Sequence, residues 1–235
     1  DGYFNRKVSA IGLAPCRSPI HRPFEKMKIM STHPKPDRSG PNPTRAHGAW
    51  IYLFSSVAAG AFVGNEHGIE SAMLVGTGFV GAFLVVAALS VGVRRKRRQL
   101  LTGAGLVVVS PLAALGLSAD PVFLRVAGLA ALTALAAIYF EKRWGFLSRA
   151  ALVTGIATLT LAAPVVAAAG GASMGRCVLL FAMLWPFFCW RTLCVAAPLR
   201  AGATWDRVQL RARGLQEAAI AAVWTVAVTV LLLIF

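Results

Sequence analysis

The chain has 235 residues, of which 57% are hydrophobic and only 14% are charged, and its formal net charge is +15. A soluble domain of this size carries about a quarter charged residues, so the composition argues against a soluble protein. The basic residues lie in the N-terminal segment and at the ends of apolar runs, without a recognisable binding module, which argues against a nucleic-acid partner.

The beginning of the chain differs from the rest. Residues 1–44 are basic and show no hydrophobic period, and their Pro-, Ser- and charge-rich part predicts disorder. Residues 1–29 mix charges, prolines and aromatics ahead of a short polar leader that begins at Met30. We therefore expect the natural chain to start at Met30 or at Met27. Residues 45–235 form a second region, a transmembrane helical domain.

Seven apolar runs follow one another in this second region. Each approaches the roughly 20 residues that a helix needs to cross about 30 Å of hydrocarbon. Lipid offers no partner to open backbone groups, so every run is predicted to be a helix. The predicted fold class is all-α, a polytopic membrane protein with seven transmembrane helices; an eighth helix beyond the apolar C-terminus stays an open alternative. The runs are residues 48–64, 70–93, 100–118, 121–140, 148–170, 176–197 and 215–235.

Basic residues divide the loops into two sets. The loops after the second, fourth and sixth runs are rich in Lys and Arg, and the three loops between them contain neither. Cytoplasmic loops carry the excess of Lys and Arg, so this alternation places the N-terminus in the cytoplasm. We expect a multi-pass protein of the bacterial cytoplasmic (inner) membrane. The basic residues of the richest loop are Arg94, Arg95, Lys96, Arg97 and Arg98.

This basic loop is a candidate contact for an anionic lipid head group. It also argues against the Mg²⁺–diphosphate chemistry of intramembrane prenyltransferases, which needs carboxylate-rich cytoplasmic motifs. Residues 94–99 and 199–213 together contain one carboxylate, Asp206. We find no catalytic or metal motif and predict no cofactor, and the question of whether the chain is an enzyme stays open. The cysteines lack the CxxC spacing typical of metal sites; they are Cys16, Cys177, Cys189 and Cys194.

The first span begins with the sequence R-A-H-G-A-W, residues 45–50. This segment resembles the R/K-E-H-G-A-W start of the YwiC-like integral membrane proteins, with Ala46 where that pattern usually has Glu. Residues 159–164 resemble the family's Leu-Ala-Ala-Pro helix, and residues 185–191 resemble its aromatic helix that ends in a basic residue. The resemblance covers residues 43–200. The family is largely uncharacterised, so the resemblance implies a fold more than an activity.

The same segment holds the candidate functional site, which consists of Arg45, His47, Gly48 and Trp50. At the cytoplasmic edge of the first span, a titrating imidazole could meet water, a substrate or a phosphate head group. Gly48 would let another backbone or a ligand approach closely. The plainer alternatives are a structural hydrogen bond for His47 and an interfacial anchor for Trp50.

Few ionisable residues fall within the spans. Arg125, Arg176 and Glu217 lie near helix starts, and they are candidates for a polar cavity because charge inside a membrane is costly. Alternatively, their side chains reach the membrane surface from the helix end. On the outer side, Glu66 and Glu70 could share a helical face. We favour an ordinary polar loop there.

Prolines and glycines predict features of packing. Pro111, Pro164 and Pro186 fall inside spans and predict kinks. Gly60 and Gly64 form a G-x3-G pair that predicts close helix packing.

Three classes of function remain. We favour binding or transport of a small or lipid-like molecule, since kinked helices with few charges permit it. A structural or assembly subunit that binds other membrane subunits is the alternative, and a membrane-embedded lipid-modifying enzyme is less favoured. The lipid bilayer is the partner that all three share.

Overall fold

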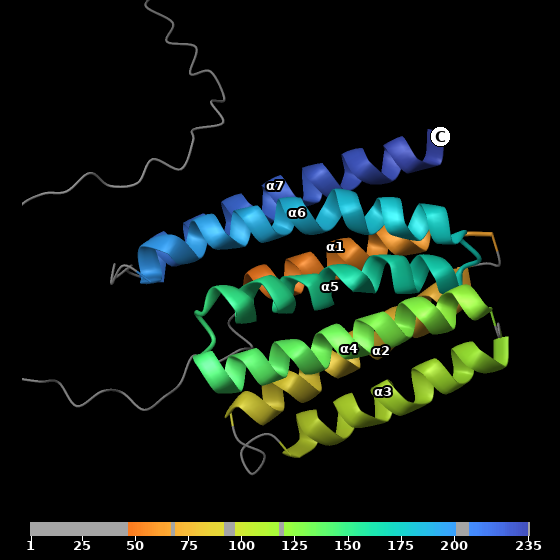
Figure 1. The fold of residues 1–235 in the computed structure, drawn as a ribbon, viewed down its shortest axis with the longest axis horizontal. Coiled ribbons are helices and arrows are strands. Elements are labelled where there is room, and N and C mark those ends of the chain that lie inside the picture. The colour runs from red at the N-terminus through yellow and green to blue at the C-terminus, as the bar shows by residue number, and fades with distance from the viewer. Residues whose placement is uncertain (1–46, 67–68, 92–96, 118–119, 201–206, 235) are drawn as a thin grey trace, which may run out of the picture. The chain divides into compact units, whose positions relative to one another are not determined.

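The computed structural model describes residues 47–66, 69–91, 97–117, 120–200 and 207–234. Within these residues it contains seven α-helices and no strand, so the predicted all-α class is confirmed (Figure 1). The predicted N-terminal segment, residues 1–44, lies outside the described residues. The helices are α1 (His47–Val63), α2 (Ile69–Val91), α3 (Arg97–Leu117), α4 (Pro121–Trp144), α5 (Arg149–Ala169), α6 (Met174–Arg200) and α7 (Arg207–Ile234).

Local capping groups set the starts of α4 and α5. Asp120 caps α4, with its Oδ1 accepting the Val122 N–H at 2.7 Å, and Pro121 occupies the first turn. This is the helix start that the Asp-Pro pair favours. The Ser148 hydroxyl caps α5 in the same way. Between them, Gly145 ends α4 with φ of 82°, a left-handed conformation that favours glycine.

Five of the helices are long and apolar enough to cross a bilayer. Their length and mean hydropathy support a multi-pass membrane protein. A shorter apolar stretch, Ala49–Val63, lies in α1. The five stretches are Ile69–Val86, Pro121–Trp144, Arg149–Ala169, Met174–Pro198 and Ala212–Ile234.

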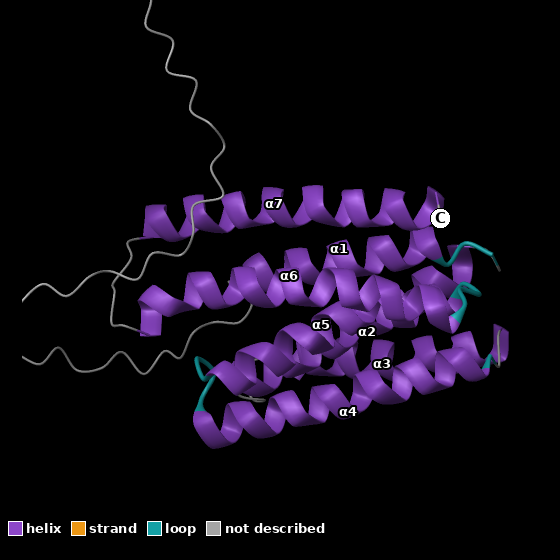
Figure 2. Cartoon of the chain, turned by 45° about the horizontal axis from the view of Figure 1, so that its top comes forward, coloured by secondary structure: helices purple, strands orange, loops and turns teal. Residues whose placement is uncertain are grey.

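Successive helices run antiparallel, so their ends gather at two ends of a bundle (Figures 1 and 2). At one end, which we call the Gly170 end, the Glu66 N–H donates to the Gly170 carbonyl at 2.9 Å. This bond joins the turn after α1 to the turn after α5. The opposite end, which we call the Ser148 end, holds the turn from Gly145 to Ser148 and the adjoining ends of α6 and α7 (Figure 1).

Helix α5 forms the centre of the bundle. It packs against α1, α4 and α6, whereas α3 packs on α2 and α7 packs on α1 and α6. About two thirds of α5 (67%) is buried, more than of any other candidate span. Outer helices present large apolar side chains outward, such as Leu132 on α4 and Val223 on α7. In a membrane, lipid covers such surfaces, so their exposure is expected.

Small residues let α1 approach α5 closely. A β-carbon added at Gly60 would lie 2.9 Å from the Cβ of Val166 and would overlap the Ala163 carbonyl. One at Gly64 would lie 2.7 Å from the Ala167 carbonyl carbon. The G-x3-G pair of α1 therefore packs on an A-x3-A pair of α5, and the close packing predicted for it is confirmed.

Helix α6 contains Pro186, whose ring nitrogen has no hydrogen to donate to the turn before it. Beside this position, the Trp224 indole of α7 donates from Nε1 to the Met183 carbonyl at 3.1 Å. The Trp224 ring also stacks on Phe187, with ring centroids 4.7 Å apart. The proline turn of α6 is thus a docking point for α7.

Candidate functional site

A buried ion pair links α6 to α7. Arg191 donates from Nε to Oε2 of Glu217 at 2.8 Å and from Nη2 to Oε1 at 2.7 Å. Glu217 is 7% exposed and the Arg191 side chain is 17% exposed. The rigid fork of a guanidinium matches the two oxygens of a carboxylate, so a paired contact of this kind is strong and directional.

The length of α7 explains why Glu217 is buried. The helix begins at Arg207 rather than near residue 215, so Glu217 lies inside it instead of in its first turn. Ala221 and Thr225 follow at one-turn intervals on the same buried stripe. Of the two alternatives that the sequence left open for Glu217, its burial favours a polar environment inside the bundle over a side chain that reaches the membrane surface.

A second arginine approaches the same carboxylate from the solvent side. Arg213 lies one turn before Glu217 on α7, with its Nε 3.4 Å from Oε1, and its side chain is 46% exposed. This contact is longer than the two bonds from Arg191. Two positive charges therefore share one negative charge.

Helix α1 adds hydroxyl groups beside the pair. Tyr52 is buried and stacks on Phe188 of α6, with ring centroids 4.6 Å apart. Its hydroxyl faces Thr192 and lies within electrostatic range of Arg191 and Glu217. The Thr192 hydroxyl is buried without a well-oriented hydrogen-bond partner among the described residues. Polar groups from three helices therefore meet here, and we call Tyr52, Arg191, Thr192, Arg213 and Glu217 the polar cluster.

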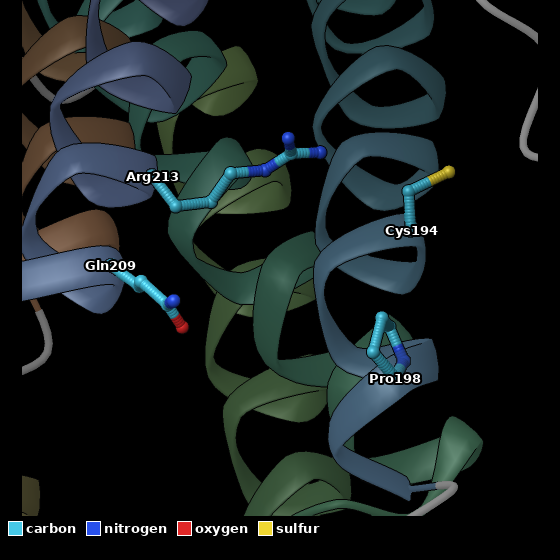
Figure 3. A pocket seen from close by; sticks show the side chains of 4 residues that line it. All are labelled: Cys194, Pro198, Gln209 and Arg213. Atoms are coloured by element: carbon cyan, nitrogen blue, oxygen red, sulfur yellow. The ribbon is translucent and has the colours of Figure 1, made fainter. Parts of the chain in front are cut away.

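A pocket of about 340 Å³ opens next to this cluster. Cys194 and Pro198 of α6 and Gln209 and Arg213 of α7 line it. Figure 3 shows Arg213 and Gln209 extending from α7 towards α6, whereas the Cys194 sulfur points away from α7. Arg213 is thus the residue that connects the pocket to the buried pair.

The pocket lies at the level where two candidate spans end. The apolar stretch of α6 ends at Pro198 and that of α7 begins at Ala212. Arg213 and Gln209 fall on either side of this boundary. In a bilayer, the boundary of the hydrocarbon is where head groups begin. The arrangement can therefore offer a guanidinium to a group at the membrane surface.

The cluster has the chemistry of a binding site for an anion. Arginine donates through five N–H groups and binds carboxylate or phosphate, and it stays charged at any ordinary pH. The Arg191 guanidinium also lies 5.5 Å from the ring centroid of Trp190, close enough for a cation–π contact. Within the described ranges, no three His, Cys, Asp or Glu side chains gather as metal ligands.

The candidate site predicted at the start of the first span is described only in part. Arg45 lies outside the described residues, and so does the side chain of His47; the backbones of His47 and Gly48 belong to the first turn of α1. Trp50 stacks on Phe54, with ring centroids 5.5 Å apart. The site therefore stays a prediction, and α1 contributes Tyr52 to the polar cluster instead.

The basic loop predicted to contact anionic lipid is also described only in part. Arg94, Arg95 and Lys96 lie outside the described residues, and so does the side chain of Arg97. Arg98 is in the first turn of α3 and is exposed. The head-group contact predicted for this loop stays a prediction.

At the Gly170 end, Glu66 pairs with Arg176 of α6, with Oε1 and Nη1 2.8 Å apart. Both side chains are exposed, at 56% and 42%, so screening by water weakens the pair. Glu66 lies in the turn after α1 and Glu70 in the first turn of α2, so the two do not share a helical face. Arg125 is exposed on α4.

Sequence reasoning missed most of the polar cluster. Arg191 was noted only as the basic end of an aromatic helix, and Tyr52 and Thr192 carried no signal. One signal was available, because Arg213 and Glu217 are four residues apart and share a face if the helix continues through both.

No protein-family model matches the chain, and no curated protein or solved structure shows significant similarity to it. The site therefore stands on its own geometry.

Proposed function

We propose that the chain is a seven-span protein of the bacterial cytoplasmic membrane that binds or transports a small or lipid-like molecule. Five apolar helices of spanning length among the described residues support this proposal, which takes α1 and α3 as the remaining two spans. The helix ends that flank the three basic loops lie at the Ser148 end, which would face the cytoplasm.

One observation carries the binding function. The Arg191–Glu217 pair lies within candidate spans, next to a pocket that Arg213 joins to it. Ionisable groups at membrane depth are expensive and commonly mark the path or site of a ligand. The buried hydroxyls of Tyr52 and Thr192 add further polar groups beside the pair.

We also propose membership of the YwiC-like family. Support comes from the sequence R-A-H-G-A-W at residues 45–50, of which residues 47–50 begin α1, and from the placement of residues 159–164 in the buried part of α5. Because the family is largely uncharacterised, membership would indicate the fold more than the activity. The proposed function therefore rests on the polar cluster.

Mass spectrometry of the purified chain tests the function. The full chain is extracted in a mild detergent, and small molecules that remain bound are identified after denaturation. We expect one amphiphile to be retained at a fixed ratio. Arg213→Gln should lower that ratio, whereas Arg143→Gln, an exposed arginine in the last turn of α4, should not.

The same preparation separates the alternatives. A stoichiometric protein partner with no retained small molecule would favour an assembly subunit and would contradict the binding proposal. A retained molecule that the protein converts to a product would favour a lipid-modifying enzyme.

A further inference from the structure

Among the described residues, the pocket beside Arg213 has an excess of positive charge. Arg191 and Arg213 face one carboxylate, Glu217, and the described lining residues of the pocket add no acidic group. A charge held near hydrocarbon needs a counter-charge, because the low dielectric there makes an unpaired ion costly. An anion in the pocket would supply it.

The two arginines differ in how firmly they are held. Arg191 makes two short bonds to Glu217, which use its Nε and one Nη. Arg213 approaches the same carboxylate only at 3.4 Å, is half exposed and points its guanidinium towards α6 (Figure 3). Arg213 can therefore turn from Glu217 to a ligand without breaking the buried pair.

We propose that this pocket binds a phosphate group, with Arg213 as its principal ligand and Glu217 holding Arg213 in place when the pocket is empty. This inference rests on the proposed function and names the ligand chemistry of its site. A guanidinium fork matches phosphate oxygens. Gln209, on the same wall of the pocket, adds an amide that can donate to such an oxygen.

Two sources could supply the phosphate group, a lipid head group or a phosphate in solution. The position of the pocket at the end of two apolar stretches suits both, because head groups and water meet at the boundary of the hydrocarbon. The experiment therefore uses one probe for each source.

The test measures the thermal unfolding midpoint of the full chain in dodecyl maltoside micelles. Three probes are titrated: dodecyl phosphate, inorganic phosphate and the neutral amphiphile 1-dodecylglycerol. Each is added to the wild type, to Arg213→Gln and to Arg143→Gln. The two variants lose the same charge, and Arg143 is exposed on α4, at the same end of the bundle.

We expect dodecyl phosphate to raise the midpoint of the wild type and of Arg143→Gln equally. To reach the same shift, Arg213→Gln should need at least about tenfold more dodecyl phosphate, because it loses a charge-assisted hydrogen bond. The same dependence on Arg213 with inorganic phosphate alone would support the proposal and identify a soluble phosphate as the source. If Arg213→Gln fails to fold, Arg213→Lys replaces it, and it should also bind more weakly because lysine lacks the fork.

Equal shifts in both variants, or no shift with either phosphate probe, would overturn the inference. If only 1-dodecylglycerol stabilises the wild type and both variants, the pocket does not bind phosphate. The proposed binding of a lipid-like molecule would still hold. If mass spectrometry finds no retained native molecule but dodecyl phosphate still binds through Arg213, the proposed function is wrong and the phosphate site is supported.

Discussion

Arg191 and Glu217 lie 26 residues apart in the chain, and two hydrogen bonds of 2.8 Å and 2.7 Å join their side chains across α6 and α7. The pair is nearly closed to solvent on the Glu217 side and open to the pocket through Arg213. It therefore has two consequences, one for the stability of the bundle and one for ligand binding.

Removal of one partner should destabilise the protein strongly. Glu217→Gln leaves the Arg191 charge buried without a counter-charge, and breaking a buried pair in this way typically costs about 3 kcal/mol. Arg191→Met with Glu217→Met should recover most of this loss, because neither charge then remains. The free energy of unfolding in mixed detergent micelles measures both effects.

The exposed pair at the Gly170 end provides the control. Glu66→Gln removes the negative charge that pairs with Arg176, and we expect a loss of less than about 1 kcal/mol, since both side chains are open to solvent. Equal losses from Glu66→Gln and Glu217→Gln would contradict the claim that the buried pair contributes more to stability than the exposed pair.

The contact between α1 and α5 should be sensitive to a single methyl group. Gly60→Ala places a β-carbon against the Ala163 carbonyl, and overpacking of this kind costs about 1–3 kcal/mol. Gly128→Ala is the matched control, because nothing lies within 4 Å of a β-carbon there. It should be neutral or should stabilise α4 by up to about 1 kcal/mol. Unfolding free energies compare the two, and a larger loss at Gly128 would argue against the packing described.

The indole of Trp224 should contribute through its N–H as well as its ring. Trp224→Phe keeps an aromatic ring against Phe187 but removes the donor to the Met183 carbonyl, so it should cost about 1 kcal/mol. Trp144→Phe, at an exposed position stacked on Phe140, should cost less. Thermal unfolding midpoints in detergent measure the difference, and equal effects would mean that the hydrogen bond adds nothing.

The proposed orientation can be read from cysteine labelling in intact cells. In a background without native cysteines, Ser173→Cys at the Gly170 end should react with an impermeant maleimide from outside. Phe146→Cys at the Ser148 end should react only after the membrane is permeabilised. Both positions are exposed, so both should label in permeabilised cells. The reverse pattern would invert the topology.

The positions of the helices could be predicted because their cause is local. A long apolar run must satisfy its own backbone hydrogen bonds in lipid, which only a helix achieves. The Asp120–Pro121 start was predicted for a similarly local reason and is confirmed by the 2.7 Å cap. The start of α7 was predicted near residue 215, but the helix begins at Arg207. Its first residues are polar, so hydropathy alone does not reveal that the helix extends beyond its apolar stretch.

The polar cluster could not be predicted in the same way. Its members come from α1, α6 and α7, and nothing in a single sequence says that these three helices are neighbours. Arg191 and Glu217 therefore looked like two separate helix-end charges.

The sequence alone indicates a multi-pass helical protein through its apolar runs, and the basic residues at 94–98 and the alternation of charged loops predict which side faces the cytoplasm. The tertiary structure alone decided that Glu217 meets Arg191 and that Arg213 lies at a pocket. The physical reason is that the length of an apolar run and the charge of a loop are properties of one continuous segment of the sequence. An ion pair between helices depends on which helices pack together and on how each is rotated about its axis.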